Sequence, residues 1–112
     1  MKLLTKELLE QLPLLRGQEN VEDPIAYAKF FNPYGIGRWF IMEYDLESQI
    51  AFGYVSLFGD YNDELGNFSM QELEEIRVPM MKGLKPTETL ERDLSFAPTP
   101  LSEIKKQYTR SN

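Results

Sequence analysis

Hydrophobic and polar positions alternate over three stretches in the first half of the chain, and this alternation predicts strands. The stretches are residues 25–31, 38–44 and 50–58, and they are rich in the aromatic and β-branched side chains that strands favour. The connections at 32–37 and 45–49 are short enough for hairpins, which join antiparallel neighbours. The pattern therefore predicts an antiparallel meander over residues 25–58.

The second stretch carries apolar side chains on both faces, which predicts a central strand. Strict alternation divides it into two sets: Trp39, Ile41 and Glu43 on one face, and Phe40, Met42 and Tyr44 on the other. The apolar neighbours of Trp39 favour a buried structural indole, with Gly53 on the next strand leaving room for it. The alternative is a Trp39 that stacks on a base or ligand.

Three short helices are predicted around this sheet. The first covers residues 5–12, with Thr5 as N-cap. The second covers residues 69–77, because Ser69 and Glu72 have the spacing of a capping box. The third covers residues 99–108, with Thr99 as N-cap and proline in the first helical position.

The remaining segments complete the predicted fold. Alternation over residues 90–96 predicts a last strand, and residues 59–66 are predicted to form a polar loop. Asn67 and Phe68 are expected to form a short bridge or a fourth strand. We therefore expect a single α+β domain over residues 1–112, with an antiparallel meander sheet of three to five strands and about three short helices packed against it.

The chain has no cysteine and no histidine, which excludes several classes of site. Disulfides, thiolate metal sites, thiol catalysis and imidazole acid–base chemistry all require one of these residues. No apolar run approaches the roughly 20 residues that span a bilayer, and the N-terminus lacks the apolar core of a signal peptide, so a cytoplasmic location without membrane association is predicted. The net charge of −6 argues against direct non-specific binding to nucleic acid.

Blocks of residues along nearly the whole chain resemble one bacterial family. They include Lys29-Phe30-Phe31-Asn32-Pro33, Leu65-Gly66-Asn67-Phe68-Ser69, Glu91-Arg92-Asp93-Leu94 and Pro98-Thr99-Pro100-Leu101. In this order the blocks resemble the family known as domain of unknown function 2958. The resemblance implies a small uncharacterised protein of a mobile genetic element, that is, a plasmid, a phage or a conjugative element.

Acidic residues are segregated from basic ones. Between Trp39 and Ile76 the chain has nine acidic residues and no lysine or arginine. Such a surface could bind a basic protein, including the DNA-binding groove of a host defence enzyme, by charge complementarity. The plainer interpretation is a set of solvated turns and a helix N-terminus, where acids interact favourably with the dipole. The candidate partner-binding residues are Asp60, Asp63, Glu64, Glu72, Glu74 and Glu75.

Two pairs of carboxylates offer a second hypothesis, an enzymatic metal site. If the strands that carry them are neighbours, the oxygens could converge on Mg²⁺ and support phosphodiester hydrolysis. The candidate catalytic and metal-binding residues are Glu43, Asp45, Glu91 and Asp93. The plainer expectation is that Glu43 forms an ion pair with Lys29 or Arg92.

The sequence leaves three functions open. The acidic segment favours a protein that is not an enzyme, needs no cofactor and binds a basic or nucleic-acid-binding protein through an acidic surface. The resemblance implies that it is an accessory protein of a mobile genetic element, for which counter-defence is one such role. The alternative is a Mg²⁺- or Mn²⁺-dependent hydrolase or nuclease. A structural subunit or small-ligand binder is the third, and a dry apolar pocket between sheet and helices would favour it. The bases from Lys82 to Lys85 are expected to be solvated surface.

Overall fold

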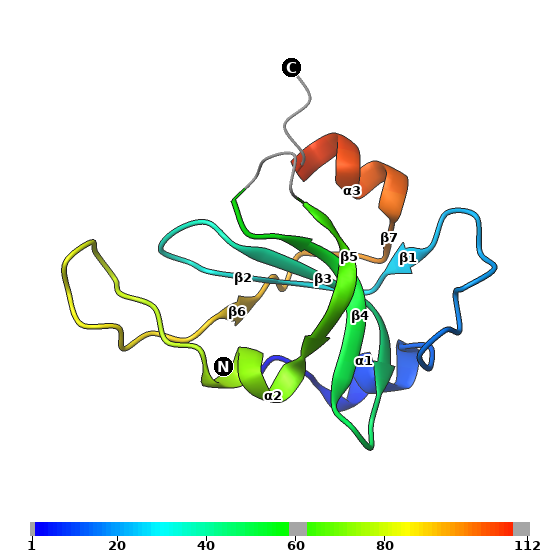
Figure 1. Cartoon of the computed structure of the whole chain (residues 1–112), viewed down its shortest axis with the longest axis horizontal. Coiled ribbons are helices and arrows are strands. Elements are labelled where there is room, and N and C mark those ends of the chain that lie inside the picture. Colours follow the sequence, from blue (N-terminus) through cyan, green and yellow to red (C-terminus); the bar gives the residue numbers. More distant parts are fainter. Residues whose placement is uncertain (1, 59–62, 109–112) are drawn as a thin grey trace.

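The chain folds into two antiparallel sheets and three short helices. The computed structural model describes residues 2–58 and 63–108, with side chains as far as Gln107. In chain order the elements are α1 (Lys6–Gln11), β1 (Ile25–Ala26), β2 (Ala28–Phe31), β3 (Arg38–Asp45), β4 (Ile50–Ser56), β5 (Glu64–Ser69), α2 (Met70–Glu75), β6 (Glu91–Arg92), β7 (Thr99–Pro100) and α3 (Leu101–Tyr108). The larger sheet has the order β5-β4-β3-β2-β6, and β1 pairs with β7 in the smaller one (Figure 1). This is an α+β fold around an antiparallel meander, as predicted.

Helices cover both faces of the larger sheet, and each side has its own hydrophobic core. On one side α1, α2 and the N-terminal segment pack on a core that includes Phe30, Ile41 and Tyr44. On the other side α3 packs on a core that includes Phe40 and Ile104. Figure 1 shows α3 across the sheet from α1 and α2. Because β3 contributes to both cores, it is the central strand that its two apolar faces predicted.

A β-bulge in β3 changes which face some of its side chains occupy. Ile41 and Glu43 pair with consecutive residues of β4, so Met42 is the extra residue. After the bulge Tyr44 joins Ile41 in the core beside α1 and α2, whereas Met42 and Glu43 line the same cleft on the α3 side. The faces predicted for Glu43 and Tyr44 are therefore wrong, because a period of two holds only along an unbroken ladder.

Gly53 lies opposite Ile41 at this bulge, where the backbone of β3 comes close. A Cβ on Gly53 would overlap the carbonyl oxygen of Phe40, so only glycine fits. Trp39 packs against the core beside α1 and α2, and its ring also lies against Gly37. Gly53 is thus required by the close approach of two strands and not, as expected, by the Trp39 ring.

The helix caps that the sequence predicted for the first two helices are present. The Thr5 hydroxyl accepts a hydrogen bond from the Leu8 N–H at 3.2 Å. The Ser69 hydroxyl accepts one from the Glu72 N–H at 3.1 Å. Each bond satisfies a backbone donor that the first turn of a helix leaves without an intrahelical partner. Local side chains therefore determine where α1 and α2 begin.

Several strand boundaries differ from the predicted ones; β4, for example, ends at Ser56 and not at residue 58. The stretch 25–31 divides into β1 and β2, which pair with different strands. The stretch 90–96 contributes only β6, because Asp93 accepts hydrogen bonds from the N–H and hydroxyl of Ser95 and turns the chain. The predicted loop 59–66 overlaps the start of β5 at Glu64.

The start of α3 is fixed by residues far away in the sequence. Thr99 belongs to β7, which pairs with β1, so it is not the N-cap that the sequence predicted and α3 begins at Leu101. The Leu101 N–H donates to the Pro24 carbonyl at 2.8 Å. The Ser102 N–H donates to the Asp23 carboxylate at 2.9 Å, so the cap of this helix comes from the segment before β1.

Candidate partner-binding site

The four carboxylates proposed as a metal site do not converge. β3 carries Glu43 and Asp45, while Glu91 and Asp93 lie on and just after β6, and β2 separates these two strands in the sheet. Within residues 2–58 and 63–108 no three acidic side chains are close enough to share an ion. The condition under which the sequence predicted a magnesium site, neighbouring strands, is therefore not met.

Glu43 is instead a buried acceptor for backbone amides. Its side chain is 5% exposed. One carboxylate oxygen accepts the Arg16 N–H at 2.7 Å and the other accepts the Gln18 N–H at 2.9 Å. These two bonds take the place of the expected ion pair with Lys29 or Arg92. Glu43 thus ties the loop of residues 12–24 to the centre of the sheet.

The Gln18 side chain completes this attachment. It is buried, and its amide nitrogen donates to the carbonyls of Ile25 at 2.8 Å and Met42 at 2.9 Å. Its amide oxygen accepts the Ile25 N–H at 2.7 Å. Buried polar groups satisfied in this way hold a loop in one conformation. No motif in the sequence marked Gln18, because its partners are backbone groups.

The other candidate aspartates are engaged in turns. Ser48 donates its hydroxyl and its N–H to Asp45, and these bonds lower the pKa of that carboxyl. Ser95 does the same for Asp93, and Lys29, at 3.6 Å, also lowers the Asp93 pKa. Hydrogen bonds to the charged form favour it, so both groups are stable carboxylates.

The candidate partner-binding acids lie at the two ends of β5. Asp63 and Glu64 are at its start, and α2, with its three glutamates, follows directly on its end. Six residues of strand separate the two groups by about 20 Å. Asp60 falls outside the residues that the structure describes. The acids therefore flank β5 and do not form the single patch that the sequence suggested.

Basic residues face part of the acidic helix. A cleft of about 550 Å³ lies between α1 and α2, and Lys2, Lys6, Glu74 and Glu75 all line it. Tyr44 also lines this cleft, and its pKa is raised because of its burial and, to a lesser extent, the negative charges of Glu74 and Asp45. Two lysines thus line the same cleft as two of the three glutamates of α2.

β5 is the last strand of the sheet, and in the described part of the chain no strand pairs with its outer edge. The Met70 N–H donates to the Gln49 carbonyl at 3.0 Å, just beyond the β4–β5 ladder. Hydrogen-bonded pairs alternate in an antiparallel ladder, so the even-numbered residues of β5 bond to β4. The backbone N–H and C=O groups of Leu65 and Asn67 therefore point toward the open edge.

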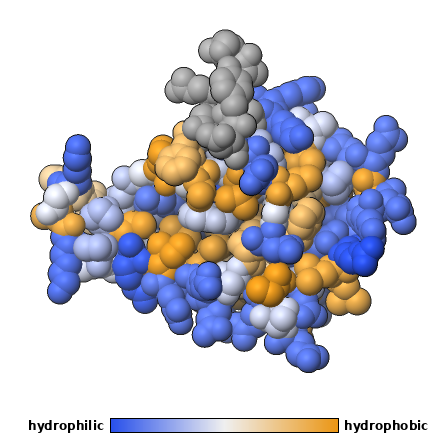
Figure 2. Space-filling model, in the orientation of Figure 1, coloured by the Kyte–Doolittle hydropathy of each residue, from blue (hydrophilic) through white to orange (hydrophobic). Residues whose placement is uncertain are grey.

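A hydrophobic cleft of about 670 Å³ lies beside this edge on the α3 side of the sheet. Its apolar lining comes from Leu15, Val21, Met42, Phe52, Leu65 and Leu101. Leu65, on β5 itself, is 40% exposed. Figure 2, in which β5 lies toward the viewer as in Figure 1, shows hydrophobic side chains across the middle of this side of the molecule, with hydrophilic ones among and around them. Exposed apolar surface of this kind next to an open edge is typical of a binding surface.

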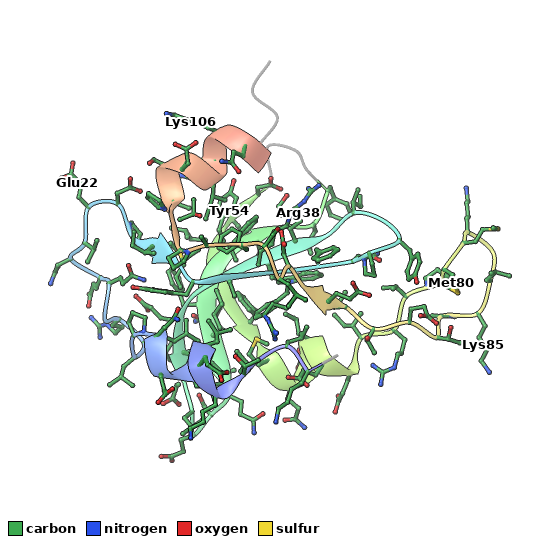
Figure 3. All side chains as sticks on the ribbon, turned by 180° about the vertical axis from the view of Figure 1, so that it is seen from behind. Glu22, Arg38, Tyr54, Met80, Lys85 and Lys106 are labelled. Carbon is green, nitrogen blue, oxygen red and sulfur yellow. The ribbon has the colours of Figure 1, made fainter. Side chains whose placement is uncertain are left out.

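A second exposed surface is the arm formed by residues 78–88. Val78 and Glu88 bridge at its base, where the Val78 N–H donates to the Glu88 carbonyl at 2.7 Å. The arm extends away from the body with Met80 and Lys85 near its tip (Figure 3). Met80 is 55% exposed, and Lys85 is exposed as well. The bases predicted to be solvated surface lie on this arm.

Comparison with known proteins identifies a family but no activity. A family model described as "Protein of unknown function (DUF2958)" matches residues 3–111. No curated protein and no solved structure matches the chain. Among the residues whose structure is described, no helix is long and apolar enough to cross a membrane.

Proposed function

We propose a binding function for this chain, which belongs to the DUF2958 family of proteins of unknown function. It is an accessory protein of a mobile genetic element, and it acts in the cytoplasm by binding a basic or nucleic-acid-binding protein of the host. Counter-defence is one role that such binding would serve. The observation that carries the proposal is an open strand edge, β5, with acidic side chains at both ends and a hydrophobic cleft beside it.

Charge and hydrophobic area have different roles in such an interface. Acids around its rim attract a basic partner and exclude acidic ones, and they act mainly on the association rate and on specificity. Apolar area at its centre supplies most of the affinity. β5 combines the two, because Glu64 and Glu72 are exposed at its ends and Leu65 is half-exposed between them.

Binding is favoured over catalysis because the candidate catalytic carboxylates do not share a site, and three of the four already accept hydrogen bonds from other residues of the chain. Glu43, Asp45 and Asp93 each accept hydrogen bonds from the protein itself. A two-metal hydrolase needs carboxylates that share a site and leave positions for water and substrate. No observation in the described part of the chain favours the hydrolase over the binding protein.

Charge reversal on α2 tests the proposal. The variant Glu72→Lys, Glu74→Lys, Glu75→Lys is compared with a control, Glu7→Lys, Glu10→Lys, Glu103→Lys, which changes the net charge equally on α1 and α3. Each is crosslinked in the host bacterium, and the captured proteins are quantified by mass spectrometry. We expect wild type and control to capture the same basic proteins and the α2 variant to lose them, because charge reversal on α2 replaces attraction of a basic partner by repulsion.

Two results would contradict this proposal. Equal capture by all three proteins would show that the α2 acids contribute nothing to recognition. Equal loss in both variants would show that only net charge matters. Thermal unfolding of each variant confirms that the fold is retained, since substitutions on exposed helix positions rarely change stability by more than about 0.5 kcal/mol.

A further inference from the structure

We propose that β5 binds its partner by strand addition: an extended segment of alternating basic and apolar residues pairs with the outer edge of β5. The proposal rests on the binding function above and specifies the chemistry of the bound segment. Strand addition at an exposed edge obtains affinity from main-chain hydrogen bonds and specificity from alternate side chains.

The two edges of the sheet differ in how far they are protected. Proteins usually protect edges with very short strands, lysine, proline or bulges, because an open edge pairs with other chains. At one edge β6 has two residues, of which Arg92 donates through its side chain to the carbonyls of Lys2 and Leu3. At the other edge β5 has six residues and contains no lysine and no proline. Of the two edges of the described sheet, only the β5 edge is therefore open.

The outward backbone groups of β5 can hold a short strand. Leu65 and Asn67 each present one N–H and one C=O to the edge, as the alternation of the β4–β5 ladder requires. Between them Gly66 has no atom within 4 Å of the position its Cβ would take. A strand added here therefore finds paired donors and acceptors, and Gly66 between them carries no side chain.

The cleft beside β5 selects apolar residues at alternate positions. Leu65 and Asn67 line it together with Phe52, on the α3 side of the sheet. Side chains of a strand point alternately to its two faces, so every second residue of an added strand faces this cleft. The intervening residues face the other side, where Glu64 is exposed at the start of β5.

The charges around β5 favour a basic segment over a second copy of this chain. Glu64 and Glu72 are exposed at the two ends of β5. In an antiparallel pair of two β5 strands, each start would meet the acidic α2 end of the other. Like charges placed opposite one another are destabilising, so self-pairing is disfavoured.

The first test uses a defined peptide on the intact protein. The probe is a hexapeptide of alternating lysine and valine, acetylated and amidated at its ends, titrated into ¹⁵N-labelled protein. We expect the amide signals of Leu65 and Asn67 to shift most. A peptide with glutamate in place of lysine should bind at least about tenfold more weakly, because attraction becomes repulsion. Two further peptides are methylated on alternate backbone nitrogens, one on the odd-numbered and one on the even-numbered residues. Only every second N–H of an added strand faces β5, so one of these two peptides should lose binding.

The second test changes the edge itself. In Asn67→Pro the outward N–H is replaced by a ring, which an edge strand tolerates because β4 does not use that N–H. Asn67→Ala removes the same side chain and keeps the N–H. We expect the proline variant to bind the lysine–valine peptide at least about tenfold more weakly, and the alanine variant to bind it within about twofold of wild type.

Each other outcome overturns the inference. It is wrong if the lysine–valine peptide does not bind, if both methylated peptides bind as well as the unmethylated one, or if the two Asn67 variants bind the peptide equally. It is also wrong if wild type forms a dimer that Asn67→Pro abolishes, since β5 then pairs with a second copy. If Asn67→Pro leaves capture of host proteins intact while the α2 variant loses it, the proposed function stands and strand addition fails.

Discussion

Glu43→Gln distinguishes a structural carboxylate from a catalytic one. Glu43 accepts two backbone N–H bonds, from Arg16 at 2.7 Å and Gln18 at 2.9 Å, and it is buried. Glutamine has the same size but only one acceptor oxygen, so its amide group must face one of these N–H donors. The substitution therefore removes one charge-assisted hydrogen bond, weakens the other and leaves a donor unpaired.

The expected loss of stability follows from these changes. Hydrogen bonds to charged groups contribute about 1.5–3 kcal/mol, and an unsatisfied buried donor costs about 1–3 kcal/mol. Because the two contributions overlap, we expect Glu43→Gln to lower the free energy of unfolding by about 2–4 kcal/mol. This is a large part of the about 5–15 kcal/mol typical of a domain. For a chain of this length it corresponds to a melting temperature lower by roughly 10–20 °C.

Urea unfolding followed by the fluorescence of Trp39, the one tryptophan, measures the effect. With a slope of about 1–3 kcal/mol per molar urea, the midpoint should fall by roughly 1–2 M. Glu47→Gln is the matched control, since Glu47 is exposed in the turn after β3 and should change the free energy of unfolding by less than about 0.5 kcal/mol.

A double variant locates the origin of the loss. Gln18 and Glu43 hold the same loop, so the loss in Glu43→Gln, Gln18→Ala should be smaller than the sum of the single losses. Should Glu43→Gln unfold at the same urea concentration as Glu47→Gln, the carboxylate does not hold the loop. Glu43 would then again be a candidate for catalysis.

Other substitutions and conditions test further parts of the structure. Gly53→Ala should prevent stable folding, as judged by circular dichroism, because its Cβ would overlap the β3 backbone; Gly66→Ala, in open space, should melt near the wild-type temperature. Ser69→Ala should lower the free energy of unfolding by about 1 kcal/mol in urea, since it removes the cap of α2, and an unchanged midpoint would refute the role of the cap. The lowered pKa values of Asp45 and Asp93 contribute stability above their unfolded pKa of about 3.9, which is lost as pH falls through the folded pKa. The urea midpoint should therefore decrease as pH is lowered below about 4, and a constant midpoint between about pH 5 and 3 would contradict the assignment.

Local chemistry predicted a large part of this fold. β3 was identifiable as the central strand because apolar side chains occupy both of its faces. Thr5 and Ser69 gave the starts of α1 and α2, because a hydroxyl three residues before a backbone donor is a purely local cap. Features of this kind depend on neighbours within one turn or one strand, so the sequence alone is sufficient.

Features that depend on distant partners were not predictable in this way. The bulge at Met42 adds one residue to β3. Because apolar side chains occupy both faces of this strand, the alternation of apolar and polar residues does not reveal the extra residue. The cap of α3 comes from Asp23, which lies 79 residues before Ser102. The start of β5 reads as a polar loop because one edge of this strand and part of its surface are exposed. The bulge and the cap of α3 thus depend on contacts with distant segments, which the local pattern does not contain.

The bulge also explains why Glu43, which the sequence suggested as a catalytic carboxylate, has a structural role. Without it, Glu43 would share the face of Ile41 and lie in the core beside α1 and α2, where a carboxylate would need a buried cation. The extra residue at Met42 turns Glu43 to the α3 side, where two backbone N–H groups of the loop at 12–24 meet it. That loop supplies Leu15 and Val21 to the cleft beside β5. One inserted residue in the central strand therefore both removes a carboxylate from the core and fixes the wall of the proposed binding cleft.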